Sequence, residues 1–444
     1  MPEILPDPTW YPFTQMREHL DAPPLSIVSA KGCWLFDAEG NRYLDGVSSL
    51  WANLHGHRHP AIDRAVRGQL GRAAHTTLLG LTHPGAVALS RRLVEIAPPG
   101  LARVFYSDSG ATAVEAALKL AFQYMRLRGE GKRTTFIHLG QSYHGDTLGA
   151  VSVGGIDLFH KVFGPLLHET VALPAPHRYR HPEWRGDEAA WRRARFAEAE
   201  RVIEENAPRA CALIVEPLIQ AAGGMLTHPD GYLAHLRALT RRHGLLLIAD
   251  EVATGFGRTG RMFACEHEGV SPDLLCLGKG LTGGYLPLAA TLATEEVFSA
   301  FLGEVGENKT FFHGHTYTGN PLGCAAALAS LDVFANERVL ESLPPKLARY
   351  AEGMRRLATL PHVGDVRFRG FMGGVELAAD EEGGPYPPAE RRGRRAALEA
   401  RRRKLLLRPL GDVVVVLPPL SISLEELDFL FAALEASIRA ATST

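Results

Sequence analysis

The sequence predicts an α/β protein whose core is a mostly parallel sheet with helices on both faces. From about residue 61 to 330, short apolar runs alternate with longer segments whose apolar residues recur at helical spacing, as over residues 111–128. Strands buried on both faces have continuous apolar runs, and five segments fit this description: 104–106, 135–137, 212–215, 245–250 and 274–277. Ligands of such sheets bind beyond the carboxyl ends of the strands, so a site is expected there.

The chain has 444 residues, more than one simple core usually supports, so more than one domain is expected. Residues 61–336 are predicted to form the large domain, which ends in a helix over residues 321–336. Residues 337–444 mix helices with short strands and predict a smaller α+β domain. Residues 1–60 form an N-terminal segment that we assign to the small domain, with a hairpin over residues 34–45.

Composition argues against several classes of partner. The net charge is −1, which gives no electrostatic reason to bind nucleic acid or a membrane surface. No apolar stretch approaches the roughly 20 residues that span a bilayer. The five cysteines are widely scattered, which indicates free thiols in a reducing cytoplasm, and no Cys-x-x-Cys pair suggests a metal site. A cytoplasmic protein with small-molecule ligands is expected.

Two of the predicted strands end next to ionisable residues. Asp250 closes an apolar run, and Lys279 follows the next such run, 29 residues later (279 − 250). A surface lysine in a turn and a capping aspartate are the simple alternatives, but burying either charge unpaired is costly. A pyridinium cofactor would pair both, because the carboxylate can hold a protonated ring nitrogen and the lysine can hold the aldehyde as a Schiff base. This chemistry indicates pyridoxal phosphate, bound by residues 61–336.

Two loops ahead of predicted helices could hold the cofactor phosphate. Residues 107–112 follow a strand and open a helix, where free backbone N–H groups and the helix dipole favour an anion. An ordinary N-cap would have the same sequence. Residues 314–320 precede another helix, and the Thr316 hydroxyl could donate a hydrogen bond to phosphate. A turn with capping residues is the alternative there.

Three side chains could contact the cofactor ring or a substrate. Tyr143 and His144 lie in a polar loop after a predicted strand, and either ring could stack on a flat ligand. Arg408 lies just before the apolar run 413–417 and could hold a carboxylate through two parallel hydrogen bonds. A satisfied loop aromatic and a surface arginine are the alternatives.

One motif points to a different cofactor. Residues 255–260 match the pattern G-x-G-x-x-G of dinucleotide-binding loops, which is typical of NAD-dependent oxidoreductases. The segment that follows, residues 261–265, is short and bounded by turns, so it lacks the helix that such a loop should open. NAD binding is therefore not expected.

These stretches together resemble the class III aminotransferases, a family of fold-type I enzymes that use pyridoxal phosphate. The family motifs are residues 250–260, which read DEVATGFGRTG, and residues 277–280, which read LGKG. Other stretches resemble the biotin-pathway branch of the family, so that the likeness covers essentially the whole chain: Trp10–Met16, Asp45–Ser49, Tyr143–Thr147, His313-Gly314, Thr316, Gly319–Pro321 and Arg408-Pro409.

The resemblance implies a role for each matching residue at the cofactor. Lys279 would hold the cofactor and move protons, Asp250 would pair with the pyridine nitrogen, and Tyr143 would stack on the ring and touch substrate. The phosphate would be bound by backbone groups of one subunit and completed from the second subunit of a homodimer, through Gly110 and Ala111 of the first and His315 and Thr316 of the second.

The reaction implied by the resemblance is amination of 8-amino-7-oxononanoate to 7,8-diaminononanoate. Arg408 would hold the substrate carboxylate, and Gly314 would line the same pocket. Family members that use S-adenosylmethionine as amino donor usually have tyrosine where Phe13 stands and tryptophan where Leu50 stands, so both this donor and lysine stay open. Other class III activities, such as ω-amino acid:pyruvate transamination, and cofactor binding without turnover are the alternatives.

Overall fold

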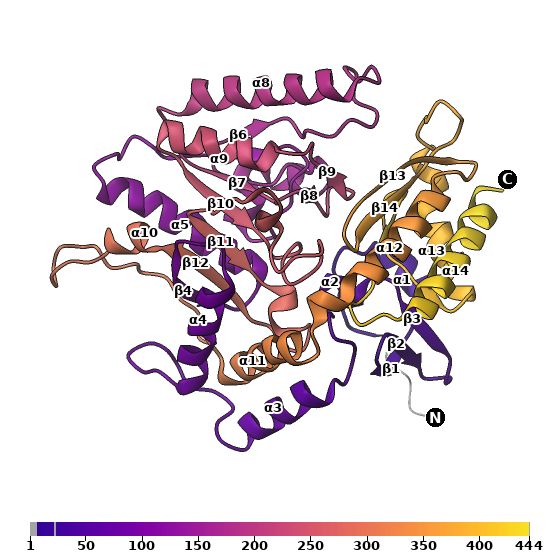
Figure 1. Ribbon diagram of the computed structural model, residues 1–444, viewed down its shortest axis with the longest axis horizontal. Helices are drawn as coiled ribbons and strands as arrows, with labels where there is room; N and C mark the ends of the chain where they lie inside the picture. Colours follow the sequence, from indigo (N-terminus) through magenta and orange to yellow (C-terminus); the bar gives the residue numbers. More distant parts are fainter. Residues whose placement is uncertain (1–6, 22–23, 444) are drawn as a thin grey trace.

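The computed structural model describes residues 7–21 and 24–443, which form a large lobe around a central sheet and a smaller lobe beside it (Figure 1). The central sheet has the strand order β4-β12-β11-β10-β7-β5-β6, and only β12 runs antiparallel to its neighbours. The mostly parallel sheet and all five predicted strands are confirmed. The strands are β4 (Leu101–Ser107), β5 (Thr135–Leu139), β6 (Thr170–Leu173), β7 (Ala210–Val215), β10 (Leu246–Asp250), β11 (Leu274–Leu277) and β12 (Ala289–Thr294).

Both faces of this sheet are buried, which explains its unbroken apolar strands. Leu213, Leu247 and Leu275 lie in the core on one face, and burying each of them contributes about 1.5–3 kcal/mol. Ile214 and Ile248, one residue further along, belong to the core of the other face. Helix α5 (Gly110–Leu127) covers the second face, and three others contribute to the first: α4 (Pro84–Ile96), α8 (Glu188–Asn206) and α9 (Tyr232–His243).

Shorter elements connect and extend the large lobe. Helix α11 (Pro321–Asn336) begins and ends at the predicted residues, and it packs against α3 (Pro60–Leu70). No α-helix opens at the glycine motif 255–260, in agreement with the sequence argument, and the chain continues through bends at residues 261–263 into a short 3-10 helix. The remaining elements are α2 (Ser48–Trp51), α6 (Leu148–Ser152), α7 (Asp157–His160), η1 (Lys161–Leu166), β8 (Ile219–Gln220), β9 (Leu226–Thr227), η2 (Ala264–Glu268), η3 (Lys279–Thr282) and α10 (Glu295–Ser299).

The small lobe is built from both ends of the chain. The predicted hairpin is present as β2 (Trp34–Asp37) and β3 (Arg42–Asp45), and β15 (Leu405–Leu406) pairs with β3 in parallel. The division at residues 60 and 336 stays a prediction. The other small-lobe elements are β1 (Ile27–Lys31), α12 (Val339–Leu357), β13 (Val363–Arg369), β14 (Met372–Leu377), η4 (Pro388–Glu390), α13 (Arg392–Arg402), β16 (Pro409–Leu410), β17 (Val413–Val416) and α14 (Leu424–Thr442).

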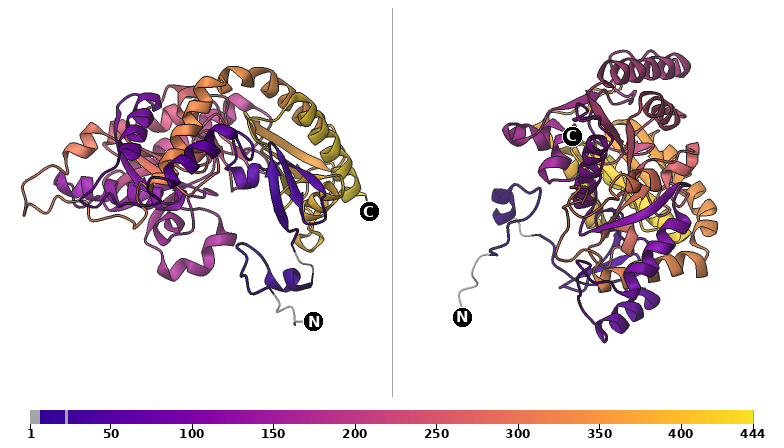
Figure 2. Two further views of the ribbon diagram at one scale, coloured as in Figure 1. Left: turned by 90° about the horizontal axis from the view of Figure 1, so that it is seen from below. Right: turned by 90° about the vertical axis from the view of Figure 1, so that its left-hand side faces the viewer.

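The N-terminal segment with α1 (Met16–Asp21) lies at the edge of the molecule in the left view of Figure 2, and its Phe13 ring contacts the Phe159 ring of the large lobe. It is tied to the small lobe by ion pairs from Glu18 to Arg391 and Arg394. Among the residues that the structure describes, no helix combines the length and the apolar character needed to cross a membrane. The five cysteines are unpaired and buried, and burial raises the pKa of the Cys211 thiol to about 12.

Candidate active site

The register of three strands brings three ionisable side chains to one edge of the central sheet. Val215 of β7 lies beside Ala249 of β10, so Glu216 and Asp250 follow at the same level. Asp250 in turn lies beside Cys276 of β11, and Lys279 comes three residues later in the chain. The three side chains face a pocket with a volume of about 1080 Å³ at the carboxyl ends of the strands, where the sequence predicts the site.

Asp250 is buried, and each of its two carboxylate oxygens has one hydrogen-bond partner in its own lobe. Its Oδ1 accepts a hydrogen bond from the backbone N–H of Val252 at 3.0 Å. Its Oδ2 lies 2.7 Å from Nδ1 of His144, whose ring is also buried. An ionised carboxylate can only accept, so Nδ1 of His144 carries the proton. These contacts fix the orientation of the carboxylate, and the pairing with His144 was not anticipated from the sequence.

Lys279 is an amine in a setting that disfavours its charge. Burial lowers the pKa of Lys279, while Asp250 and Glu216 act in the opposite direction. Its Nζ lies 5.1 Å from the centre of the Trp51 ring. A buried lysine whose pKa is lowered can exist as the neutral amine, the form needed of a nucleophile or general base.

Glu216 is a site residue that the sequence reasoning missed. It is buried, and its two oxygens accept hydrogen bonds from the backbone N–H groups of Tyr143, at 3.1 Å, and Ala221, at 2.9 Å. Burial raises the pKa of Glu216 to about 7, and nearby Asp250 adds to the rise. The signal was available, because Glu216 ends the apolar run 212–215 in the same way that Asp250 ends its own run.

The N-terminus of α5 forms the other wall of the inner pocket. Ser109 and Thr112 exchange hydrogen bonds between side chain and backbone, so the N-cap reading of this loop is correct. The first amides of a helix have no acceptor within it, and this exchange leaves those of Gly110 and Ala111 pointing out of the helix. Both residues line the pocket. The capping and the anion-site readings are therefore compatible.

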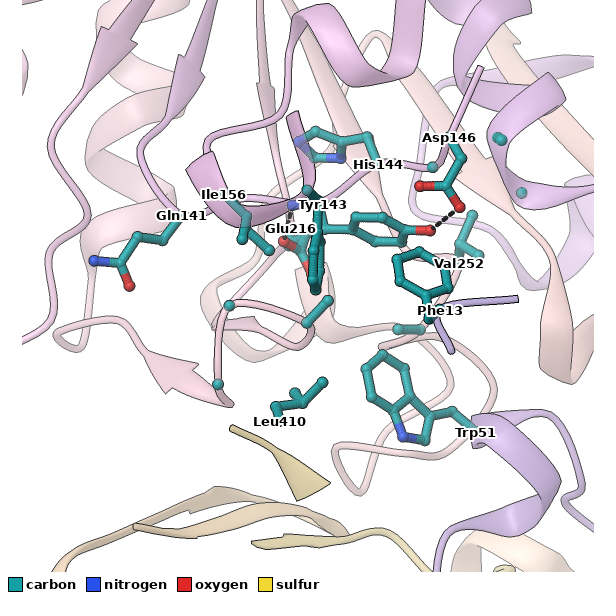
Figure 3. A pocket seen from close by; sticks show the side chains of 18 of the residues that line it. Phe13, Trp51, Gln141, Tyr143, His144, Asp146, Ile156, Glu216, Val252 and Leu410 are labelled. Carbon is teal, nitrogen blue, oxygen red and sulfur yellow. Dashed lines mark hydrogen bonds between the residues drawn. The ribbon is translucent and has the colours of Figure 1, made fainter. Parts of the chain in front are cut away.

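The outer part of the pocket is lined by residues from distant segments (Figure 3). Phe13 and Leu50 are both more than half exposed and line it together with Arg408. The Tyr143 hydroxyl donates to Asp146 at 2.7 Å, which turns its ring along the pocket wall. Phe159, another unanticipated residue, meets the rings of Phe13 and Tyr143 edge-on at 5.2 and 6.2 Å.

Three predicted residues lie elsewhere. Gly314, His315 and Thr316 are not among the residues that line the pocket of their own chain. They precede α11, and His313 next to them contacts Lys119 of α5 at 3.1 Å. Gly314 and Thr316 are exposed.

The fold and the pocket define a transaminase, and the chain belongs to the aminotransferase class-III family, which it matches over residues 15–438. It is 57% identical to the adenosylmethionine-8-amino-7-oxononanoate aminotransferase of Nitratidesulfovibrio vulgaris, over 98% of this chain and 80% of that one. The crystal structure of the enzyme of that name from Methanocaldococcus jannaschii superposes with a TM-score of 0.92 at 45% identity, over 97% of both chains. A PLP-bound amine transaminase from an uncultivated Pseudomonas species gives a TM-score of 0.94 at 38% identity, over 98% of this chain and 99% of the other.

The cofactor is therefore pyridoxal phosphate, and the residues of the inner pocket fit it. Asp250 and Lys279 offer the carboxylate and the amine that its ring nitrogen and aldehyde require, and the start of α5 offers amides to its phosphate. Two glycines allow the segments around this space to pack closely against each other. A Cβ on Gly110 would come within 2.5 Å of Val252, and a Cβ on Gly145 would overlap Ala111.

Proposed function

We propose that this chain transfers an amino group to 8-amino-7-oxononanoate and releases 7,8-diaminononanoate. The observation that carries the proposal is a single pocket with the buried pair Lys279 and Asp250 at its inner end and the Arg408 guanidinium at its outer rim. An arginine there can hold the substrate carboxylate while the ketone reaches the inner end. The names of the relatives support the same reaction.

Each residue of the inner pocket has a distinct task in this reaction. Bound pyridoxal phosphate stabilises the negative charge that develops on the carbon losing its proton. Asp250 holds a proton on the ring nitrogen, and His144 keeps the carboxylate in place. Lys279 Nζ takes the proton from the donor carbon and later returns one to carbon 7 of the acceptor. Gly110 and Ala111 hold the phosphate through their amides, and Tyr143 lies against the ring.

The amino group is carried in two half-reactions through the same pocket. A donor amine, S-adenosylmethionine or lysine, leaves as the corresponding oxo compound. The ketone of 8-amino-7-oxononanoate then enters and leaves as the amine. Phe13 and Leu50 line the region that both substrates must share, so they are the residues through which the donor is selected.

A spectral half-reaction tests the proposal. Holoenzyme with its visible cofactor band is mixed with S-adenosylmethionine or with lysine alone, and loss of the band is followed. The true donor should remove the band, and 8-amino-7-oxononanoate should then restore it with formation of 7,8-diaminononanoate. A band that neither donor changes would overturn the proposed function.

We further propose that the enzyme is a cytoplasmic homodimer in which Gly314, His315 and Thr316 reach the pocket of the partner. The exposure of Gly314 and Thr316 supports this arrangement, as do the large exposed side chains of Phe312 and Tyr317 beside them. Mixing Lys279→Ala with Thr316→Glu subunits tests it. Hybrid dimers would hold one intact site, so activity should return to about a quarter of the wild-type level. No recovery in a mixture that native mass spectrometry shows to contain hybrids would contradict a shared site.

An ω-amino acid:pyruvate activity is the second candidate, because the amine transaminase from Pseudomonas is as similar in fold to this chain as the enzyme from Methanocaldococcus jannaschii is. Such an enzyme would use pyruvate as the acceptor for the band recovery described above. Recovery with pyruvate but not with 8-amino-7-oxononanoate would establish this alternative.

A further inference from the structure

The short helix α2, which carries Leu50 into the pocket, is left-handed. Its four residues have φ values of 51°, 47°, 67° and 70°, all in the left-handed region, and none of them is glycine. The turn is closed by hydrogen bonds from the Trp51 N–H to the Val47 carbonyl, at 2.8 Å, and from the Ala52 N–H to the Ser48 carbonyl, at 3.0 Å. L-residues avoid this conformation, above all in succession, so contacts outside the turn must hold it.

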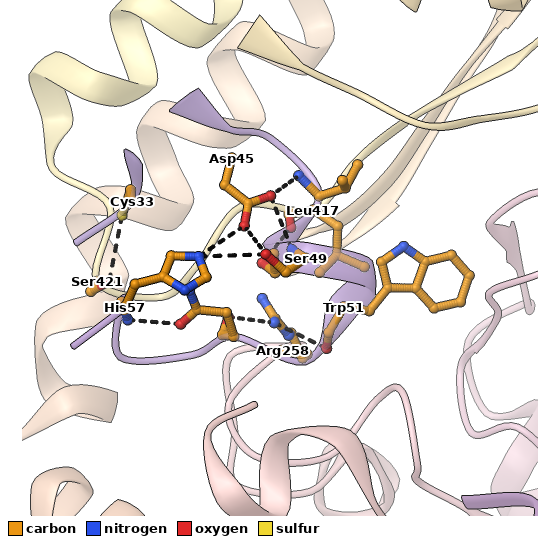
Figure 4. Close-up of polar contacts among 12 residues, drawn as sticks. Cys33, Asp45, Ser49, Trp51, His57, Arg258, Leu417 and Ser421 are labelled. Carbon is orange, nitrogen blue, oxygen red and sulfur yellow. Dashed lines mark hydrogen bonds and ion pairs between the residues drawn. The ribbon is translucent and has the colours of Figure 1, made fainter. Parts of the chain in front are cut away.

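The carboxylate of Asp45 provides these contacts at the start of the turn (Figure 4). Asp45 is the last residue of β3 and is 1% exposed. Its Oδ1 accepts hydrogen bonds from the N–H groups of Val47, at 3.3 Å, and Ser49, at 3.0 Å. Its Oδ2 accepts the Ser49 hydroxyl at 2.7 Å and lies 3.5 Å from Nε2 of His57. One buried side chain thus satisfies the donors that the turn directs inward.

The end of the turn is held from the opposite side. The buried Arg258 guanidinium donates to the carbonyl groups of Trp51, at 3.1 Å, and Asn53, at 2.9 Å. The Ser48 hydroxyl donates to the Leu417 carbonyl at 2.6 Å. The turn is therefore fixed between the two lobes, with a carboxylate at its N–H end and a guanidinium at its C=O end.

The left-handed turn determines which of its side chains is presented to the pocket and which is buried. It leaves the Leu50 side chain 52% exposed at the pocket and buries the Trp51 ring, 5.1 Å from Lys279 Nζ. In a right-handed turn the two side chains would leave the backbone in other directions. The Asp45 carboxylate binds the backbone of the turn and the Ser49 hydroxyl, and it bonds neither the Leu50 nor the Trp51 side chain.

We propose that Asp45 is a positioning residue, which holds the left-handed turn and thereby places Leu50 as the aliphatic wall for the apolar chain of the substrate and Trp51 against Lys279. This inference rests on the proposed function and names a determinant of its specificity. Asp45 acts through conformation, so the kinetic effect of changing it should depend on how readily residues 48–51 adopt positive φ.

Substitutions at the exposed Ser49 test whether the left-handed conformation of the turn matters, without creating a cavity in the core. Ser49→Gly and Ser49→Ala both remove the hydroxyl, but only glycine adopts positive φ freely, and valine, being β-branched, adopts it least. The KM for 8-amino-7-oxononanoate should rise in the order Gly, Ala, Val, with about a 10-fold increase for Val. The visible band of the bound cofactor should be retained in all three. Equal KM values for the three variants would overturn the inference.

Rescue by glycine tests the role of Asp45 itself. Asp45→Ala should raise the KM about 10-fold with a smaller change in kcat, and Ser49→Gly added to it should recover most of the loss. Asp37→Ala is the matched control. That residue is a buried carboxylate on the same hairpin that also accepts backbone N–H groups, but it lies outside the pocket. Asp37→Ala should lower the melting temperature without changing the KM.

The outcomes separate this inference from the proposed function. If wild-type enzyme does not aminate 8-amino-7-oxononanoate, the proposed function fails, and the same series is measured with the amine that does discharge the cofactor band. If wild type turns over and Asp45→Ala matches Asp37→Ala in KM, the positioning role is excluded. Should Asp45→Ala not fold, the KM order of the Ser49 variants decides.

Discussion

The two ends of the pocket are built in opposite ways. At the cofactor end, Asp250 and Glu216 are buried, and the register of neighbouring strands fixes both. At the substrate end, Phe13, Leu50 and Arg408 are exposed and come from three segments that are far apart in the sequence. The chemical step thus depends on the packing of the sheet. The choice of substrates depends on exposed residues, whose substitution should have little effect on the packing of the core. Substitutions at the two ends should differ accordingly.

The largest effect is expected at Lys279. Lys279→Ala removes the amine that moves the proton, so turnover should fall by about 10⁴-fold or more. Steady-state rates with saturating substrates measure the loss. Lys132→Ala, at an exposed turn lysine, is the control and should behave as wild type. Activity of Lys279→Ala near the control would remove the proposed role of the cofactor end.

Arg408→Ala should act on binding instead of chemistry. Loss of a charge-assisted hydrogen-bond pair at an exposed position should raise the KM for 8-amino-7-oxononanoate by about 10- to 100-fold and leave kcat within about threefold. Arg401→Ala, an exposed arginine on α13, is the control. A fall in kcat at unchanged KM would show that the two ends are not separable in this way.

Replacing Phe13 and Leu50 at the outer end of the pocket should change the preference for the amino donor. Phe13→Tyr combined with Leu50→Trp should shift the ratio of kcat/KM for S-adenosylmethionine over lysine upward by about 3- to 10-fold, because the pocket gains a hydroxyl and a broad wall. The rate of band loss in single half-reactions measures the ratio. An unchanged ratio would place donor selection elsewhere, with Phe159 as the next residue to test.

The last prediction concerns stability at the cofactor end. The pKa of Glu216 is about 7 in the folded chain against an ordinary 4.5, so the fold binds its proton more tightly than the unfolded chain does. Its contribution is therefore present below pH 4.5 and is lost as the pH rises towards 7, by at most about 3 kcal/mol. Glu216→Gln removes this dependence, so the variant should gain stability relative to wild type between pH 5 and pH 8 in thermal melts.

Glu268→Gln is the control for this measurement. The Glu268 carboxylate also accepts two backbone N–H groups, from Gly231 and Ala234, but it lies away from the pocket. An equal pH trend in both variants would mean that Glu216 does not carry the linkage.

Sequence alone placed the strands and the helix that frame the cofactor end, because their signals are local. An apolar run that stops at a charge marks a buried strand and its end, as for Asp250, and helix α5 was placed to within one residue at each boundary. The same rule would have found Glu216. The left-handed turn at Ser48–Trp51 could not be foreseen, because non-glycine residues adopt it only under contacts from Asp45 and Arg258, which are 213 residues apart (258 − 45). The proposal that Thr316 reaches the pocket of a partner subunit concerns a second chain, about which sequence spacing carries no information.

The parallel pairing of β3 with β15 has a consequence for biosynthesis. Leu406 pairs with Asp45, 361 positions earlier in the chain (406 − 45), so the strand that ends in Asp45 pairs early with β2 but gains its second neighbour late. At ordinary rates of translation, roughly 20–70 s pass before its partner leaves the ribosome. The substrate wall next to it is therefore completed among the last parts of the enzyme, after the large lobe has been synthesised. The nascent chain can hold the cofactor end of its site before it has acquired the end that selects what is bound there.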